Sequence, residues 1–252
     1  MESLSIFKPD GTRLDALYAQ PDIPFSYLVI ICHGFSGAKE NSGHLFSLVE
    51  KLNQNGFAAL AFDFAGSGQS DGTFSSITLS RQIDDLKAVI DYAYERFSVP
   101  LLLLGRSFGG STVIGAGSDP RVAGCILWSA ALYLEEVFRT GFGAYYDIMK
   151  NGEPIHATII NTPMDMEPSF VQDIEKHDME GYLKQLKNKP LFVMQGLSDT
   201  LVKPKNAELV RSFCPQAEIH FIEEADHRFE NLKPMREDMT LTWLKKNFPP
   251  AR

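Results

Sequence analysis

Short, continuous apolar runs alternate along the chain with longer amphipathic stretches. Residues 44–55 and 77–97 carry the helical repeat of apolar positions, and Ile83, Leu86 and Val89 belong to one apolar face of the second stretch. The apolar runs have the length of strands that are buried on both faces, and they lie at 27–32, 57–62, 100–104, 123–128, 191–194 and 218–222. This alternation predicts an α/β protein with a mostly parallel central sheet and helices on both faces.

Two segments depart from this alternation. Residues 4–19 predict an antiparallel hairpin, because two strand-like runs flank a turn-forming Lys-Pro-Asp-Gly at 8–11. Residues 131–189 mix aromatic residues and methionines with polar residues and prolines, and the stretch is too long for an ordinary connection. We therefore predict a core formed by 1–130 and 190–252, with a cap, or lid, subdomain inserted at 131–189.

A candidate nucleophile follows one of the predicted strands. Residues 105–109 read Gly-Arg-Ser-Phe-Gly, which matches the G-x-S-x-G pattern of a nucleophile elbow. Strand 100–104 precedes the pattern and a small-residue helix is predicted at 107–117. The two glycines allow a sharp turn from strand to helix, which holds the serine in a strained backbone conformation with its oxygen exposed. We predict Ser107 as the nucleophile.

A second match to the same pattern occurs at 68–72, which reads Gly-Gln-Ser-Asp-Gly. Such a short pattern also arises by chance. Here it lies in a loop rich in Gly, Ser and Asp, and Asp71-Gly72 indicates a turn rather than the start of a helix. We therefore interpret Ser70 as a structural loop residue.

A serine hydroxyl needs an adjacent base, and a histidine is the expected one. In hydrolases with a nucleophile elbow, the chain order is Ser, then acid, then His. His227 lies in a loop just after the last predicted strand, whereas His220 lies within that strand. His156 and His177 fall in the predicted cap. We predict His227 as the general base.

The acid should lie between Ser107 and His227, at the end of a strand. Asp199 closes the sequence Gly-Leu-Ser-Asp that follows strand 191–194. It can accept the Nδ1–H of the histidine, which fixes the tautomer of the ring and stabilises the imidazolium. A helix-capping aspartate is the alternative interpretation. Asp226 is the second candidate, but its place next to His227 makes it a poor orienting group.

The transition state of acyl transfer also requires hydrogen-bond donors to an oxyanion. The backbone N–H of Phe108, which follows the nucleophile, is the expected first donor. The second should come from the loop after strand 27–32, which reads His-Gly-Phe-Ser-Gly at 33–37, with Phe35 supplying its N–H. We expect His33 to brace this loop by hydrogen bonding.

The net charge and the first residues of the chain limit the kinds of binding partner and the cellular location that we expect. Acidic residues outnumber basic ones by 32 to 24, which gives a formal net charge of −8. This balance disfavours nucleic acids and anionic membranes as partners. The first eight residues have an early acid, no basic start and no long apolar core, so we expect no signal peptide. No apolar run approaches the length of a membrane span, and we expect a cytoplasmic protein.

The three cysteines, Cys32, Cys125 and Cys214, lack the spacing of a metal or redox site. The first two lie in predicted strands, which favours buried free thiols. The sequence predicts neither a metal ion nor an organic cofactor. It leaves the oligomeric state open between a monomer and a homodimer.

These motifs resemble those of the α/β-hydrolase superfamily over nearly the whole chain. Within it, the chain is similar to the bacterial cinnamoyl and feruloyl esterases and to monoacylglycerol-lipase-like hydrolases. The resemblance rests on the motifs at 33–37, 63–70, 105–110, 196–199 and 226–227. It implies an α/β-hydrolase fold that carries a cap between the sixth strand and the helix before the acid-bearing strand.

Two departures from the esterase pattern lie beside the predicted reacting groups. Arg106 and Phe108 flank the serine where those esterases usually have His and Gln. Arg228 separates His227 from Phe229 where a glycine is usual. Neither departure changes a group that acyl transfer requires.

From these residues we expect a serine carboxylesterase that hydrolyses small-molecule esters through an acyl-enzyme on Ser107, with hydroxycinnamoyl esters as one candidate substrate. Tyr145, Tyr146 and Met149 are the expected substrate contacts from the cap, although such side chains equally suit the core of the cap. A thioesterase, a monoacylglycerol lipase and an amidase or aminopeptidase share the same triad. A non-catalytic binding module on this fold is the alternative of another class, and the intact triad candidates argue against it.

Overall fold

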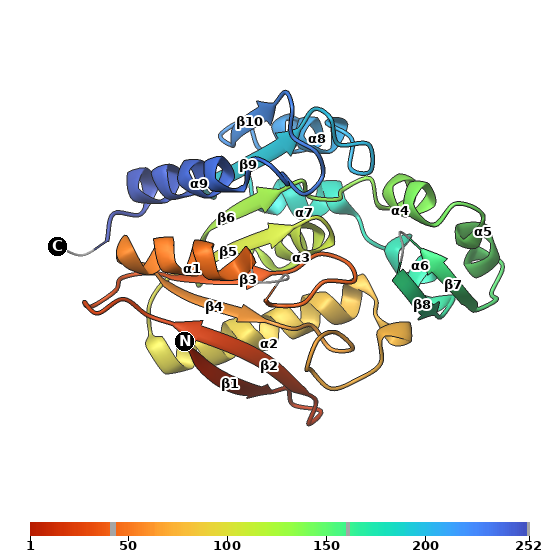
Figure 1. Ribbon diagram of the computed structural model, residues 1–252, viewed down its shortest axis with the longest axis horizontal. Coiled ribbons are helices and arrows are strands. Elements are labelled where there is room, and N and C mark those ends of the chain that lie inside the picture. Colours follow the sequence, from red (N-terminus) through yellow and green to blue (C-terminus); the bar gives the residue numbers. More distant parts are fainter. Residues whose placement is uncertain (41–43, 160–161, 251–252) are drawn as a thin grey trace.

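The computed structural model describes residues 1–40, 44–159 and 162–250. A large twisted sheet forms the centre of the molecule (Figure 1). Its strands lie in the order β1 (Glu2–Phe7), β2 (Arg13–Ala19), β4 (Ala58–Phe62), β3 (Leu28–Cys32), β5 (Leu101–Arg106), β6 (Val122–Trp128), β9 (Leu191–Gly196) and β10 (Glu218–Ile222).

The strand directions confirm the predicted architecture. β1 and β2 form an antiparallel hairpin, and β2 is antiparallel to β4. Every pairing from β4 to β10 is parallel. In the hairpin turn, Gly11 has φ 87° and donates its N–H to the Lys8 carbonyl over 2.9 Å, a conformation that favours glycine.

Helices cover both faces of this sheet. α1 (His44–Gln54) and α9 (Lys233–Asn247) pack on one face. The other face is covered by α2 (Leu79–Phe97), α3 (Phe108–Ala116) and α8 (Lys205–Phe213). Successive strand side chains point to opposite faces, so the four buried leucines at 101–104 divide between the two cores. This two-sided burial explains why the strands appear in the sequence as continuous apolar runs.

The chain between β6 and β9 forms small elements of its own. Figure 1 shows α4 (Leu134–Phe142), α5 (Ala144–Lys150) and α6 (Ser169–Ile174) grouped at one end of the molecule, with β7 (Ile155–Ile159) and β8 (Thr162–Met166). β7 and β8 pair with each other in a separate antiparallel sheet. Residues 160 and 161 of the predicted cap lie outside the described residues. α7 (Met179–Gln185) returns to the core, where the Leu183 carbonyl accepts the Cys214 thiol over 3.2 Å.

A hydrogen-bonded cluster joins α6 to the start of α2. The Asp173 carboxylate accepts the backbone N–H of Ser80 over 2.9 Å and the Ser80 hydroxyl over 2.6 Å. His177 Nε2 lies 3.2 Å from the same carboxylate. Burial alone would raise the pKa of Asp173, but the hydrogen bonds from His177 and Ser80 outweigh it and lower the pKa to about 2. The cluster therefore attaches the segment between β6 and β9 to the core through an ionised carboxylate.

Three further features concern the cysteines, membrane-spanning helices and metal-binding side chains. Cys32, Cys125 and Cys214 are free and buried, as predicted. In the part of the chain that the structure describes, no helix combines the length and apolar character needed to cross a bilayer. The same part contains no group of three or more His, Cys, Asp or Glu side chains arranged to hold a metal ion.

We expect Asp173→Asn to lower the free energy of unfolding by about 1.5–3 kcal/mol at pH 7, because it weakens hydrogen bonds to a buried charged group. A depressed carboxyl pKa stabilises the fold above the unfolded value, 3.8 for aspartate, and this contribution is lost as the pH falls towards 2. Urea unfolding at pH 7 and at pH 2.5 measures the effect, and the difference between the two proteins should shrink at the lower pH.

The matched control is Asp165→Asn. Asp165 forms an exposed ion pair with His156 over 2.7 Å, and such surface pairs contribute about 0–1 kcal/mol. Equal losses of stability in the two variants would contradict an anchoring role for Asp173.

Candidate active site

The backbone of Ser107 turns sharply between β5 and α3. Its dihedral angles are φ 55° and ψ −121°, in the region that side chains other than glycine rarely adopt. Hydrogen bonds hold this conformation, since Ser107 N donates to the Trp128 carbonyl over 2.9 Å and Ala131 N donates to the Ser107 carbonyl over 3.1 Å. The strained turn predicted from the G-x-S-x-G pattern is thus present.

The two glycines of this pattern are required by the close approach of backbone segments. A Cβ on Gly105 would overlap the carbonyl oxygen of Gly109. A Cβ on Gly109 would overlap the carbonyl oxygens of Cys32 and His33 at the end of β3. β5, α3 and the loop after β3 therefore cross at a point that admits no side chain, and Ser107 stands at this crossing.

The structure brings the three predicted triad residues together. His227 Nε2 lies 3.0 Å from Ser107 Oγ, and His227 Nδ1 lies 2.8 Å from Asp199 Oδ2. Asp199 is buried, and its second oxygen accepts the amides of Leu201 and Val202. In the tautomer that fits these contacts, Nδ1–H donates to Asp199, which leaves the Nε2 lone pair directed at the serine hydroxyl.

Asp226, the second candidate for the acid, has different partners. Its Oδ1 accepts the backbone N–H groups of Arg228 and Glu230 over 3.1 Å and 3.0 Å. These bonds form a tight turn around His227. The geometry therefore makes Asp199 the partner of the histidine ring, and Asp226 the residue that shapes the loop.

The loop after β3 lies directly against the elbow. A Cβ on Gly34 would stand 3.2 Å from the Cβ of Ser107, so the neighbouring Phe35 amide is held close to the serine. Phe108 is the first residue of α3, where backbone N–H groups have no partner within the helix. The two amides predicted to form the oxyanion hole therefore belong to segments that meet at Ser107.

His33 braces this loop, as the sequence predicted. Its Nδ1 lies 2.8 Å from the Gly34 carbonyl, and its Nε2 accepts the N–H of Phe64 over 3.2 Å. Burial lowers the pKa of His33. A neutral ring suits these contacts, because one nitrogen donates and the other accepts.

The side chain of Phe35 joins the loop to the segment between β6 and β9. Its ring lies 5.4 Å from that of Phe138, 5.6 Å from that of Phe142 and 5.5 Å from that of Phe170, measured between centroids. It also contacts Phe108 over 6.2 Å. We call these five rings the aromatic cluster. Aromatic pairs of this kind contribute about 0.5–1.5 kcal/mol each beyond their buried area.

Unusual backbone conformations gather around the same crossing. Among the described residues other than glycine, positive φ values occur at Ser36, Ser107, Ser129 and Phe229, and also at the C-terminal cap of α2. The first four follow β3, β5, β6 and β10, respectively. Strain concentrated in this way is typical of functional sites.

A pocket of about 530 Å³ opens beside Ser107 and His227. On one side it is lined by apolar residues from α4, β7 and β8, namely Val137, Phe138, Phe142, Ile159 and Met164. On the core side the lining includes Ser36, Arg106, Ser198, Asp226 and Arg228. The apolar lining thus comes mostly from the segment between β6 and β9, and the charged lining comes from the core.

The three residues that were expected to contact the substrate do not line this pocket. Tyr146 and Met149 are fully buried in the hydrophobic core, and the guanidinium of Arg139 stacks 4.4 Å above the Tyr146 ring. Tyr145 is exposed. The alternative interpretation, that such side chains build the core of the cap, fits Tyr146 and Met149. Phe138 and Phe142 line the pocket instead. They are four residues apart and so lie on the same face of a helix, and this spacing was the feature of the sequence that could have identified them.

The structure gives Ser70 a structural role, as predicted. Its hydroxyl donates to the Asp63 carbonyl over 2.6 Å and accepts the Asp15 amide over 2.9 Å. Its backbone N–H donates to the Ser67 carbonyl. This serine ties the loop after β4 to β2, and its partners are backbone groups rather than a histidine.

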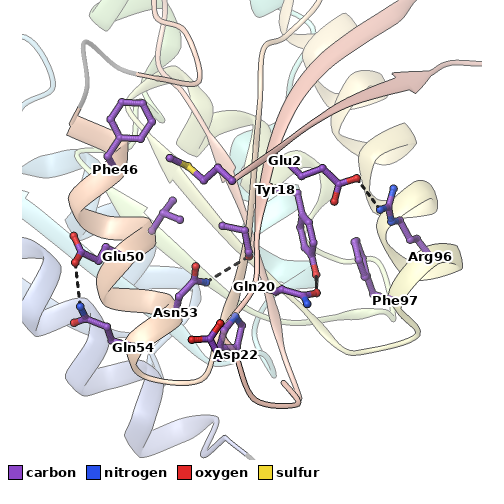
Figure 2. Close-up of a pocket in the computed structure, with 14 residues that line it drawn as sticks. Glu2, Tyr18, Gln20, Asp22, Phe46, Glu50, Asn53, Gln54, Arg96 and Phe97 are labelled. Carbon is purple, nitrogen blue, oxygen red and sulfur yellow. Dashed lines mark hydrogen bonds and ion pairs between the residues drawn. The ribbon is translucent and has the colours of Figure 1, made fainter.

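A larger cavity, of about 850 Å³, lies between α1, the end of β2 and the end of α2 (Figure 2). Ala19, which lines it, pairs with Ala59 near the start of β4, so the cavity lies at the opposite end of the sheet from Ser107. Several of its polar side chains are bonded to one another, as Figure 2 shows for Glu2 with Arg96 and for Tyr18 with Gln20. These bonds are 3.2 Å and 2.7 Å long. The described residues that line it include no serine, cysteine or histidine.

The fold and this arrangement of serine, histidine and aspartate define an α/β-hydrolase. The model of the Hydrolase_4 family, described as serine aminopeptidase, S33, matches residues 25–162, and the chain belongs to this family. An uncharacterized 31.7 kDa protein of Escherichia coli is 31% identical over 117 residues, which are 45% of this chain and 40% of that protein. The match thus spans less than half the length of this relative.

Solved structures of esterases share the fold over nearly the whole chain. Est1E from Butyrivibrio proteoclasticus with bound ferulic acid has a TM-score of 0.76 and 23% identity, covering 96% of this chain and 99% of Est1E. The Pyrococcus furiosus esterase Pf2001 has a TM-score of 0.74 and 21% identity, covering 97% of this chain and 91% of Pf2001. These likenesses confirm the predicted α/β-hydrolase fold.

We expect Gly109→Ala to lower the free energy of unfolding by more than about 3 kcal/mol and to abolish turnover, because the added methyl group meets backbone oxygens that cannot move aside. The control is Gly152→Ala. Gly152 has φ 92° but open space around its Cα, so its substitution should cost only about 1–2 kcal/mol of backbone strain. Urea unfolding measures both, and a loss in Gly109→Ala no larger than that in the control would contradict the close-crossing argument.

Proposed function

We propose that the protein is a serine carboxylesterase, with Ser107 as nucleophile, His227 as general base and Asp199 as the acid that orients the histidine. The observation that carries the proposal is the position of the His227 ring, 3.0 Å from the serine hydroxyl and 2.8 Å from the buried carboxylate. A strained nucleophile, a base and an orienting acid in hydrogen-bond contact are the parts that covalent acyl transfer requires.

In the acylation half of the reaction, Ser107 Oγ attacks the carbonyl carbon of the ester while His227 Nε2 takes its proton. The carbonyl oxygen becomes an oxyanion, which accepts hydrogen bonds from the N–H groups of Phe35 and Phe108. The tetrahedral intermediate collapses, the imidazolium gives its proton to the leaving oxygen, and the alcohol departs. An acyl group then remains bonded to Ser107.

In the deacylation half, a water molecule takes the place of the alcohol. His227 removes a proton from the water as it attacks the acyl carbon, and the oxyanion forms again at the same two amides. The proton then returns to Ser107 Oγ as the carboxylic acid leaves. Asp199 keeps the ring in one tautomer and stabilises its charged form in both halves.

We propose that residues 131–189 act as a cap whose apolar side chains select the substrate. Phe138, Phe142 and Met164 line the same pocket as Ser107. They provide an apolar wall that suits an alkyl or aromatic group next to the scissile bond. The ferulic acid bound to Est1E is a group of this kind, and hydroxycinnamoyl esters are therefore among the candidate substrates.

The charges in the pocket favour esters over aminopeptidase substrates. An aminopeptidase must bind the ammonium group of a free N-terminus, which requires an available carboxylate. The acid that lines the pocket is Asp226, and one of its oxygens accepts two backbone N–H groups. Arg106 and Arg228 line the same pocket. Their positive charge disfavours an ammonium group.

We expect Ser107→Ala to fold normally and to lower kcat for 4-nitrophenyl butyrate by about 10⁴–10⁶-fold, as loss of a triad nucleophile does elsewhere. It should also lose labelling by a fluorophosphonate probe, which reacts with activated serines. Ser70→Ala is the control and should keep labelling and most turnover. Near-wild-type hydrolysis by folded Ser107→Ala would overturn the proposal. Parallel assays with butyryl-CoA and with leucine 4-nitroanilide distinguish thioesterase and aminopeptidase activity from esterase activity.

We expect Asp199→Asn to lower kcat by about 10⁴-fold, because an amide can stabilise the wrong tautomer of the His227 ring. Asp226→Asn should have a much smaller effect, since it acts on the turn rather than on the ring. Steady-state kinetics of the two folded variants on 4-nitrophenyl butyrate provide the measurement. The opposite ranking would show that Asp226 is the orienting acid.

A further inference from the structure

Two arginine side chains line the pocket beside the predicted reacting groups. Arg106 precedes Ser107 and Arg228 follows His227. Within 1–40, 44–159 and 162–250, neither guanidinium takes part in a hydrogen bond or a close ion pair. The carboxylates of Asp199 and Glu230 attract the Arg106 guanidinium without contacting it. Arg228 is exposed, whereas Arg106 is partly buried, and a charged group that is partly removed from water normally has a hydrogen-bonded partner.

Other arginines of the chain show what is usual in this protein. Arg121 is paired with both Asp91 and Asp119, and Arg139 with both Glu135 and Asp147. Arg13, Arg96 and Arg211 each pair with a carboxylate as well. The chain has eight more acidic than basic residues, so carboxylates are abundant. Arg81 and Arg236 donate to backbone carbonyls instead. Among the described residues, Arg106 and Arg228 therefore differ from these arginines in having no acceptor in hydrogen-bond contact with the guanidinium.

Arg106 is held close to the reacting atoms. Its Nη2 would lie 3.3 Å from a Cβ on Gly34, and the Cβ of Ser107 would lie 3.2 Å from the same point. The guanidinium and the nucleophile thus contact the same short loop. Burial, followed by the charge of Arg228, lowers the pKa of Arg106 to about 10, so the group stays charged at neutral pH.

A third arginine supports this wall from behind. Arg236 is buried, stacks 3.9 Å above the Trp128 ring and donates to the Arg228 carbonyl over 3.1 Å. Burial and the charge of Arg106 lower the pKa of Arg236 to about 10. Repulsion among these side chains would be relieved by an anion in the pocket, because opposite charges attract strongly where water is partly excluded.

We propose that the pocket takes esters that carry a carboxylate or phosphate group, bound by Arg106 and Arg228, on the opposite side of the scissile bond from an apolar group. The apolar group lies against Phe138 and Phe142 across the pocket. The planar guanidinium fork matches the oxygens of a carboxylate or phosphate, which a neutral group cannot replace. This inference rests on the proposed esterase function and specifies the substrate class of that site.

Matched pairs of esters test the proposal. 4-(Butyryloxy)benzoate and 4-(butyryloxy)benzamide differ in the charge on the alcohol side, and 4-nitrophenyl hemiglutarate and its glutaramate differ in the charge on the acyl side. 4-(Butyryloxy)phenyl phosphate extends the first pair to a phosphate. We expect one anionic ester to have a kcat/KM about 10- to 100-fold above that of its neutral partner, and this preference should fall as salt screens the charges.

Three variants connect the preference to the arginines. Arg228→Gln, at an exposed position, and Arg106→Gln should each reduce the anionic-to-neutral ratio of kcat/KM by about tenfold or more. Arg106→Lys keeps the charge without the fork and should give an intermediate ratio. Comparing ratios cancels the intrinsic reactivity of each ester. Arg211→Gln removes an exposed charge that is paired with Glu208 outside the pocket, and its ratio should equal that of the wild type.

The outcomes separate this inference from the proposed function. Hydrolysis of the neutral esters with fluorophosphonate labelling, but without a preference for either anionic ester, would overturn the inference and leave the esterase proposal intact. A preference that survives in both Arg→Gln variants would also overturn it. Failure of every ester together with failure of labelling would overturn both. A preference lost in Arg228→Gln supports the inference even if Arg106→Gln does not fold.

Discussion

The candidate active site depends on one steric constraint, the crossing of three backbone segments with no side chain between them. The end of β5, the start of α3 and the loop after β3 meet at Gly105 and Gly109. A Cβ on either glycine would overlap the backbone of a neighbouring segment. Ser107 occupies this crossing with φ 55°, a conformation that costs about 1–3 kcal/mol. The buried sheet and its covering helices offset that cost, and they keep the serine oxygen in one position relative to His227.

The polar groups of the pocket lie at the edge of the sheet where the parallel strands end. Parallel strands end at the same edge of a sheet, and β5, β9 and β10 are each followed at this edge by a residue of the site. Arg106 ends β5 and Ser107 follows it, Asp199 follows β9, and His227 follows β10. The sheet therefore supplies a fixed polar side, while the segment between β6 and β9 supplies the apolar side. The proposed substrate, which would contact both sides, is accordingly amphipathic.

The sequence predicted the core better than the segment inserted into it. Strands buried on both faces appear as apolar runs whatever surrounds them, and the elbow pattern marks a local steric need, so both were recognisable without a structure. In 131–189, the composition identified an aromatic-rich insertion but not the direction of each side chain. Tyr146 points into the core, whereas Phe138 on α4 lines the pocket. That difference is set by how short helices pack, which composition alone does not determine. The place of Arg106 and Arg228 in the wall of the pocket was equally hidden, because the fold decides which charged side chains meet a carboxylate.

The aromatic cluster packs the segment between β6 and β9 against the loop after β3. The ring of Phe35 packs among Phe138, Phe142 and Phe170, while its backbone lies at the nucleophile. In many modular enzymes, a recognition segment can be exchanged while the catalytic apparatus is left alone. Here such an exchange would release the ring that positions the loop. Specificity and turnover should therefore evolve together in this chain, and a transplanted insertion would need a compatible partner at position 35 to leave the catalytic rate unchanged.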